Sequence, residues 1–122
     1  MNHEVTFNKT NRVITVLLTD KINADDARAI IKSMDKIFAD NGDQLNVLGD
    51  LAQVPSFQLD RETRRILQDG AKDYNLGKIA IIGANPTIRM FAKIIVAVLG
   101  KNKDSGFFKT EEDALTWLKK EK

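Results

Sequence analysis

Short apolar runs alternate with longer amphipathic segments along the chain, and the first two runs predict a β-hairpin. Glu4 to Asn8 and Arg12 to Leu18 are β-type runs separated only by Lys9-Thr10-Asn11, a spacing typical of a hairpin. The second run carries apolar residues on both alternating faces, Val13 and Leu17 on one and Ile14, Val16 and Leu18 on the other. Because a strand that is apolar on both faces is covered on both, we expect this run inside a sheet.

The next segment predicts a long amphipathic helix. Asn23 can cap its first turn, where Asp25 and Asp26 favour the positive end of the helix dipole. Apolar residues then recur at spacings of three and four, namely Ala27, Ile30, Ile31, Met34, Ile37 and Phe38. This stripe indicates one buried face, and Asn41-Gly42 supplies a left-handed stop.

The rest of the chain continues the alternation of strands and helices. The remaining predicted elements are a strand at Gln44–Leu51, a helix at Gln58–Tyr74, a strand at Lys78–Ile82, a helix capped by Asn85 with Pro86 in its first turn and ending near Gly100, a strand at Gly106–Lys109, and a helix opening at Thr110. Repeated β-α-β units imply right-handed crossovers and parallel strands. We therefore expect one α/β domain over residues 1–122, with a single mixed, largely parallel sheet, an N-terminal hairpin and about four helices.

Charge and cysteine content narrow the functional classes. The 19 basic and 17 acidic residues are interspersed and leave a net charge of +2, so the chain lacks the basic stripe of a nucleic-acid binder. It has no cysteine, which excludes disulfides and thiolate chemistry. The strongest apolar run, residues 90–100, is broken by Lys93 and is shorter than the ~20 residues that span a bilayer. We expect a cytoplasmic protein with no transmembrane segment.

Residues for catalysis or metal binding are not apparent in the sequence. His3 is the sole histidine and lies near the N-terminus without a base beside it, so we expect a frayed or surface residue. The acidic groups Asp25-Asp26 and Glu111-Glu112-Asp113 stand where helices begin, and capping explains them without a metal. No catalytic residue, metal or cofactor is therefore expected.

Three segments together carry a family resemblance. They are LNVLGDLAQV at residues 45–54, GKIAIIGANP at residues 77–86, and FFKTEEDALTWL at residues 107–118. With the order of elements, they resemble the STAS domain of sulfate transporters and anti-sigma factor antagonists, and in particular its SpoIIAA-like branch, sometimes grouped as STAS/SEC14 proteins. The resemblance implies a non-enzymatic regulatory or protein-interaction module.

The start of the second helix departs from this family's pattern. Anti-sigma factor antagonists carry an Asp-Ser-Ser-Gly-like segment there, in which a serine is phosphorylated. Aligning Asp50-Leu51 with the strand end places Gln58 to Arg61 across that segment, without serine, threonine or glycine. We therefore expect a module that lacks the phosphoacceptor serine. The partner-binding surface is predicted at Pro55, Ser56, Phe57, Gln58, Leu59 and Asp60, joined by the outer face of the third helix.

The third helix is apolar around nearly its whole circumference, more than a one-sided surface helix requires. Its apolar residues include Met90, Phe91, Ile94, Ile95, Val96, Val98 and Leu99. Burial between sheet and neighbouring helix is one explanation. The others are that Met90, Phe91, Ile94 and Ile95 form a homodimer face, or that they line a pocket for a hydrophobic, lipid-like molecule, with a role at the membrane surface. The leading hypothesis is an interaction module that forms a homodimer and docks a protein partner. The alternative is a carrier or sensor of a hydrophobic small molecule.

Overall fold

The computed structural model describes residues 3–42, 44–54, 60–101 and 104–120, and within them it contains five strands and four helices. In chain order these are β1 (Glu4–Asn8), β2 (Val13–Leu17), α1 (Ala24–Asn41), β3 (Leu45–Asp50), α2 (Arg61–Ala71), β4 (Leu76–Ile82), α3 (Pro86–Val98), β5 (Ser105–Phe108) and α4 (Glu111–Lys119). The predicted order of elements and the α/β class are confirmed.

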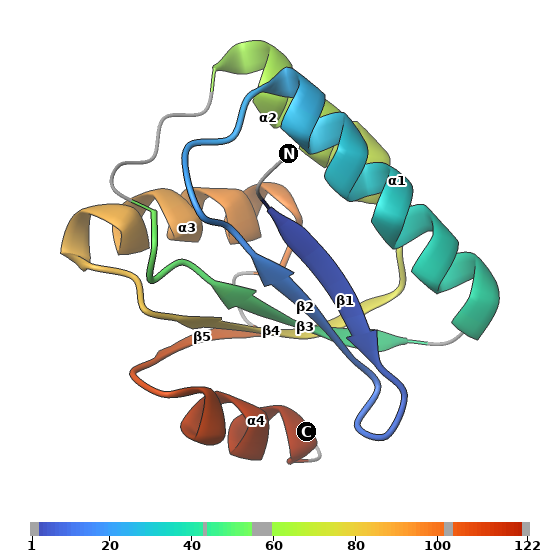
Figure 1. Ribbon diagram of the computed structural model, residues 1–122, viewed down its shortest axis with the longest axis vertical. Coiled ribbons are helices and arrows are strands. Elements are labelled where there is room, and N and C mark those ends of the chain that lie inside the picture. The colour runs from blue at the N-terminus through green and yellow to red at the C-terminus, as the bar shows by residue number, and fades with distance from the viewer. Residues whose placement is uncertain (1–2, 43, 55–59, 102–103, 121–122) are drawn as a thin grey trace.

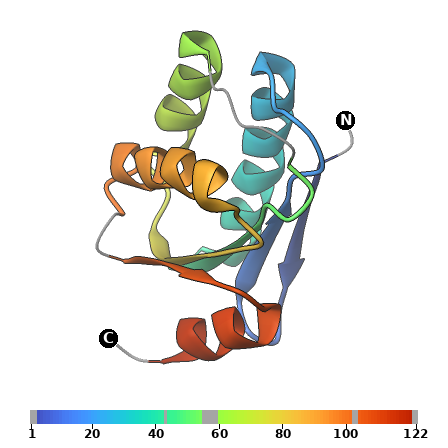
Figure 2. The same cartoon turned by 90° about the vertical axis from the view of Figure 1, so that its left-hand side faces the viewer.

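The strands form one mixed sheet in the order β1-β2-β3-β4-β5. β1 runs antiparallel to β2, and the other pairs are parallel. Because each parallel strand lies next to the one before it in sequence, right-handed crossovers carry the connecting helices to the same side. Figure 1 shows this arrangement, with α1, α2 and α3 above the sheet and α4 below it. The same two layers of helices are visible in Figure 2. We call the two sides the three-helix face and the α4 face.

Alternation along the strands divides the core into two layers. On the three-helix face, buried strand residues meet buried residues of the helices: Ile14, Val47, Ile79 and Ile81 pack with Ile30, Met34, Ile88 and Val96. On the α4 face, Val13, Leu48, Ala80 and Ile82 pack with Ala114 and Leu118. β2 contributes to both layers, so its predicted place inside the sheet is confirmed.

Local sequence signals set the helix ends as predicted. The Asn23 side chain accepts a hydrogen bond from the Asp26 amide, and the Asp26 carboxylate accepts one from the Asn23 amide, which together form a capping box. Gly42 ends α1 with a left-handed φ of 67°. Asn85 caps α3 through the Ile88 amide, and Thr110 caps α4 through the Asp113 amide.

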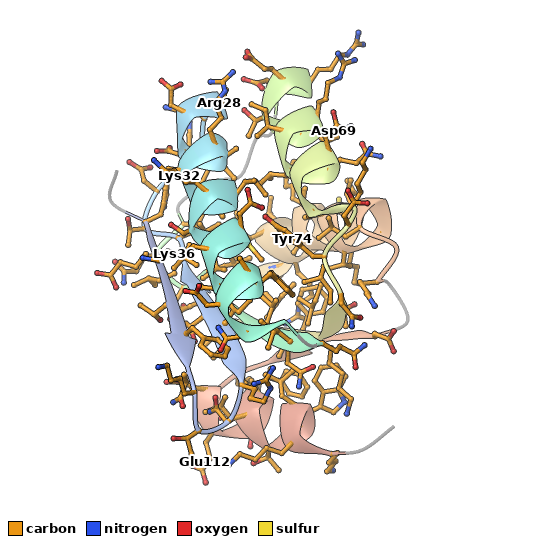
Figure 3. The ribbon with its side chains drawn as sticks, turned by 90° about the vertical axis from the view of Figure 1, so that its right-hand side faces the viewer. Arg28, Lys32, Lys36, Asp69, Tyr74 and Glu112 are labelled. Carbon is orange, nitrogen blue, oxygen red and sulfur yellow. The ribbon has the colours of Figure 1, made fainter. Side chains whose placement is uncertain are left out.

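α2 is shorter than its sequence pattern indicates. It begins at Arg61 and ends at Ala71, whereas the pattern predicts a helix from Gln58 to Tyr74; positions 58 and 59 lie outside the described residues. Tyr74 follows the helix, where its hydroxyl donates to Ile31 O of α1, and it lies beside α1 in Figure 3. Local periodicity places Tyr74 in the helix, but in the structure Tyr74 lies beyond its end and contacts α1.

Candidate functional site

The carboxyl ends of β2, β3 and β4 meet at one edge of the sheet. There the Leu18 amide donates to Asp50 O at 3.1 Å, and the Leu51 amide donates to Ile82 O at 3.0 Å. The turn after β4 is tight because Gly83 has a φ of 75°, and a Cβ at this position would lie 2.7 Å from the backbone nitrogen of Ala52. α1, α2 and α3 all begin beyond this edge, which is the side of open α/β sheets on which ligands usually bind.

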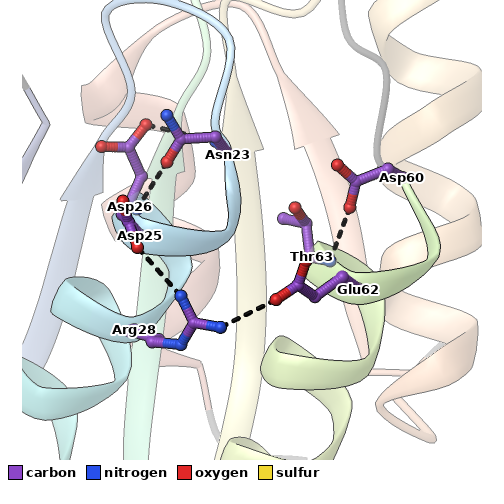
Figure 4. A network of polar contacts seen from close by, with 7 residues as sticks. All are labelled: Asn23, Asp25, Asp26, Arg28, Asp60, Glu62 and Thr63. Carbon is purple, nitrogen blue, oxygen red and sulfur yellow. Dashed lines mark hydrogen bonds and ion pairs between the residues drawn. The ribbon is translucent and has the colours of Figure 1, made fainter.

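A polar network joins the starts of α1 and α2 (Figure 4). The Arg28 guanidinium donates to Asp25 Oδ1 at 2.9 Å and to Glu62 Oε1 at 2.8 Å. All three side chains are largely exposed, so solvent and salt weaken the pairs. The network aligns the two helix starts and adds little to stability.

Asp60 is the N-cap of α2. Its carboxylate accepts a hydrogen bond from the Thr63 amide at 2.7 Å, and this bond is the main reason that the pKa of Asp60 lies below its ordinary value. The Thr63 side chain adds to the same lowering of the pKa, although the hydroxyl makes no hydrogen bond of ordinary geometry among the described residues. Thr63 itself is fully buried. The other five predicted partner-binding residues, Pro55, Ser56, Phe57, Gln58 and Leu59, lie outside the described residues.

The outer side of α3 carries an exposed apolar pair. Met90 is 66% exposed and Ile94 42% exposed, and they are the large apolar residues left exposed within the described segments. They lie four positions apart and so one above the other on the helix surface. Arg89 and Lys93 are exposed beside them, with their cationic groups 5.3 Å and 5.9 Å from the centre of the Phe107 ring. We call Arg89, Met90, Lys93 and Ile94 the α3 patch.

The structure divides the four α3 residues that the sequence groups together. Met90 and Ile94 face outward, whereas Phe91 and Ile95 are half-buried and pack against the core of the three-helix face. The start of α2 stands apart from the middle of α3 in both ribbon views (Figures 1 and 2). Asp60 and the α3 patch are therefore separate features of the described surface.

An apolar cavity of about 170 Å³, partly open to the surface, lies between the sheet and the helices of the three-helix face. α3 contributes Ala92, Ile95, Val96 and Leu99 to its lining. Of the four residues that the sequence proposes for a hydrophobic pocket, Ile95 alone appears in that lining, while Met90, Phe91 and Ile94 do not. The sequence misses the cavity because its other walls come from β2, β3, β4, α1 and α2.

His3 is buried, and the expectation of a surface residue is wrong. It is 6% exposed, its Nδ1 accepts a hydrogen bond from the Thr19 amide at 3.1 Å, and its Nε2 lies 3.4 Å from Asp26 Oδ2. These contacts fasten the residue before β1 to the segment before α1 and to the first turn of α1, so His3 has a structural role. Its place near the chain end gives no indication of them.

The described residues contain no group of three or more histidine, aspartate or glutamate side chains arranged as metal ligands. Within the same residues, no helix combines the length and the apolar character needed to cross a bilayer.

Among the titratable groups, Tyr74 has a raised pKa, mainly because it is partly buried and also because its hydroxyl bonds to Asp35. Tyr74 stacks on Phe38 of α1, which gives it a packing role against α1.

The described residues form a single mixed sheet with three helices on one face and one on the other, which is the arrangement of a SpoIIAA-like α/β domain. The chain belongs to the SpoIIAA-like family, whose sequence model matches residues 13–119. No curated protein sequence matches it significantly.

Solved structures of low sequence identity share the fold. A protein with a SpoIIAA-like fold from Shewanella loihica is 19% identical, with a TM-score of 0.71 over 95% of this chain and 91% of that one. An anti-sigma factor antagonist from Mycobacterium paratuberculosis is 21% identical, with a TM-score of 0.61 over 98% and 94% of the two chains. Phosphorylated SpoIIAA from Bacillus is 14% identical, with a TM-score of 0.57 over 95% and 98%. These structures confirm the predicted fold, and the family model confirms the predicted SpoIIAA-like family.

Proposed function

We propose that this chain is a non-enzymatic regulatory module that docks a protein partner on the α3 patch. The observation that carries the proposal is the exposed Met90 and Ile94 pair with Arg89 and Lys93 beside it. Membership of the SpoIIAA-like family supports a regulatory role. So does the description of one structure of this fold as an anti-sigma factor antagonist, a name for a protein that acts on another protein.

The composition of the α3 patch favours a particular kind of partner surface. Protein interfaces combine an apolar centre with a polar rim, and arginine is enriched at their strongest contacts. α3 spans Pro86–Val98 without a single acidic residue, so its exposed charges are all positive. A complementary partner therefore presents acidic side chains around an apolar pocket.

The proposal does not include a serine switch at the start of α2. The Asp60 carboxylate already accepts a hydrogen bond from the Thr63 amide. Thr63 is fully buried, so its hydroxyl is not accessible to a modifying enzyme. The segment Pro55 to Leu59, together with Asp60, stays a second proposed contact region for the same partner. We also propose a cytoplasmic location, as expected from the sequence.

The test begins with a photo-crosslinking residue at position 90 and, in a matched sample, at position 112. Glu112 is exposed on α4, which covers the opposite face of the sheet (Figure 1). A partner crosslinked from position 90 and not from position 112 is then purified, and its affinity is measured by calorimetry. We expect Met90→Gln with Ile94→Gln to weaken binding by about tenfold or more, and Lys93→Glu to weaken it most at low salt. Equal affinities of the wild type and the double variant would refute the proposed surface.

Sedimentation velocity of the purified chain distinguishes a second copy from a different partner. A homodimer that the double variant dissociates identifies the chain itself as the occupant of the α3 patch and replaces the proposed foreign partner. A dimer that survives the double variant uses another surface and leaves the patch free for a partner.

A second candidate function is the binding of a hydrophobic small molecule. The apolar cavity is the observation that favours it. Because Met90 and Ile94 point away from the core, this function requires the inner side of α3.

A further inference from the structure

The cavity beneath α3 is built from side chains without hydrogen-bonding groups. It measures about 170 Å³, and every described residue that lines it is apolar or glycine. It is close in size to an engineered cavity of about 150 Å³ in another protein, which stays dry and binds benzene or xenon. Water against these apolar walls would lose hydrogen bonds without replacement, so the inner part of the cavity favours an apolar occupant over water.

Three small residues on three different elements leave this space open: Gly49 of β3, Ala71 of α2 and Ala92 of α3. Each stands among larger apolar residues that line the same cavity, such as Val16, Ile81 and Ile95. A longer side chain at any of the three positions would occupy part of the volume.

Backbone geometry does not require the glycine at position 49. Its φ lies outside the left-handed region, and a Cβ there would meet only Ile81 Cγ1 at 3.8 Å and Ala80 O at 3.9 Å, which are ordinary contacts. Gly77 differs, because a Cβ at that position would lie 2.2 Å from Asn46 Oδ1. Gly49 thus keeps the floor of the cavity open at a position where a larger side chain has room.

The lining determines the chemistry of the ligand. A charged or strongly hydrogen-bonding molecule would leave its polar groups unpaired among these walls, at a high cost in binding free energy. An uncharged apolar group loses nothing of this kind and gains contacts with the surrounding isoleucine, leucine and valine side chains. The volume suits a six-membered ring or a short alkyl chain.

We propose that the cavity bounded by Gly49, Ala71 and Ala92 is a binding site for a small uncharged apolar molecule. The inference rests on the cavity alone and is independent of protein docking on the outer side of α3. The two sites share one helix but use opposite sides of it, since Ala92 is buried and Met90 is exposed.

Benzene is the probe for the first experiment, with methyl NMR of the isoleucine, leucine and valine side chains as the readout. We expect saturable shift changes in the wild type with a Kd of about 1 mM or tighter. Ala92→Leu puts a side chain into the cavity, whereas Ala97→Leu makes the same substitution on the exposed side of α3. The first variant should weaken benzene binding by at least about tenfold, and the second should bind like the wild type.

Two results would overturn the proposal: the absence of saturable binding to the wild type up to the solubility of benzene, or equal affinities of the wild type and Ala92→Leu. If Ala92→Leu does not fold, Gly49→Val fills the cavity from the sheet side and takes its place with the same expected loss. Phenol tests the ligand class, because its hydroxyl has no partner among the walls. Binding of phenol as tight as that of benzene would contradict an apolar site.

The variant Met90→Gln with Ile94→Gln separates this inference from the proposed function. It should bind benzene like the wild type, because neither residue lines the cavity. Loss of partner binding with benzene binding retained supports both proposals, and benzene binding without a partner on the α3 patch leaves the cavity site standing by itself.

Discussion

Filling the cavity should stabilise the ligand-free protein, and Ala92→Leu is the substitution that tests this most directly. The cavity measures about 170 Å³ and has room for a longer side chain at position 92. Leucine adds three carbon atoms, each worth about 0.8 kcal/mol on burial. Fixing its rotamer costs about 0.5–1 kcal/mol. The expected net increase in the free energy of unfolding is therefore about 1–2 kcal/mol.

Urea denaturation followed by far-UV circular dichroism measures this change. For a domain of this size, 1 kcal/mol corresponds to a shift in Tm of about 3–5 °C, so a thermal melt gives an independent estimate. Ala97→Leu is the matched control, because it changes helix propensity in the same way and adds its atoms on the exposed side of α3. Its free energy of unfolding should stay within about 0.5 kcal/mol of the wild type.

A loss of stability in Ala92→Leu would refute the reasoning. Overpacking of a filled core costs about 1–3 kcal/mol, so a destabilisation of that size means that the space is not available in solution. An unchanged stability, matching that of the Ala97 control, would show that the added leucine turns toward solvent.

Three further predictions concern individual residues. Tyr74 is the single tyrosine of the chain, so tyrosinate absorbance follows its ionisation alone. Because burial raises the pKa of Tyr74 in the folded state, the phenol should ionise at higher pH in the folded protein than in the urea-unfolded chain. The stabilising effect of the neutral phenol is complete below about pH 10 and declines as pH rises above it, so wild-type stability should fall more steeply than that of Tyr74→Phe in that range. Gly83→Ala should lower the free energy of unfolding by about 1–3 kcal/mol, and by more than Gly100→Ala does. Both glycines have positive φ, but an added Cβ meets backbone atoms of Ala52 only at position 83. Equal losses of the two variants in urea denaturation would contradict this prediction. Asp60→Ala should lower the Tm more than Asp60→Asn at neutral pH, because asparagine keeps the cap. Because the pKa of Asp60 is lowered in the folded state, its carboxylate stabilises the fold above about pH 4, and this stabilisation is lost as the pH falls through the folded-state pKa. The difference in Tm between the wild type and Asp60→Asn should therefore shrink in melts at acid pH.

Local signals in the sequence predict most of the fold, and the reason is physical. Asn23 and Asn85 cap their helices through bonds that span three residues, and Gly42 adopts the left-handed conformation that its residue type permits. Such contacts form between near neighbours and are therefore visible in the sequence. The alternation of apolar residues likewise predicts which strand faces meet helices, as β2 shows by entering both core layers.

Contacts between distant segments account for the differences. His3 is buried and contacts the Thr19 amide and the Asp26 carboxylate, and neither residue is adjacent to it in the chain. Tyr74 leaves the helix pattern because its hydroxyl bonds to α1. The cavity is invisible to periodicity for the same reason, since Gly49 and Ala92 reach it from elements that only the tertiary fold brings together.

The apolar circumference of α3 has two separate physical causes in the structure. Its inner side borders a cavity that the core does not fill, while its outer side leaves Met90 and Ile94 exposed. Each feature costs stability, because an unfilled void forfeits packing and exposed apolar surface forfeits burial. A sequence that retains both is consistent with a function for each side of the helix. Side chains two positions apart on a helix do not face each other, so the stability changes of Ala92→Leu and Met90→Gln should add within about 0.5 kcal/mol in the double variant. A larger departure from additivity would mean that occupancy of the cavity shifts α3, and then the apolar ligand would control the docking of the partner.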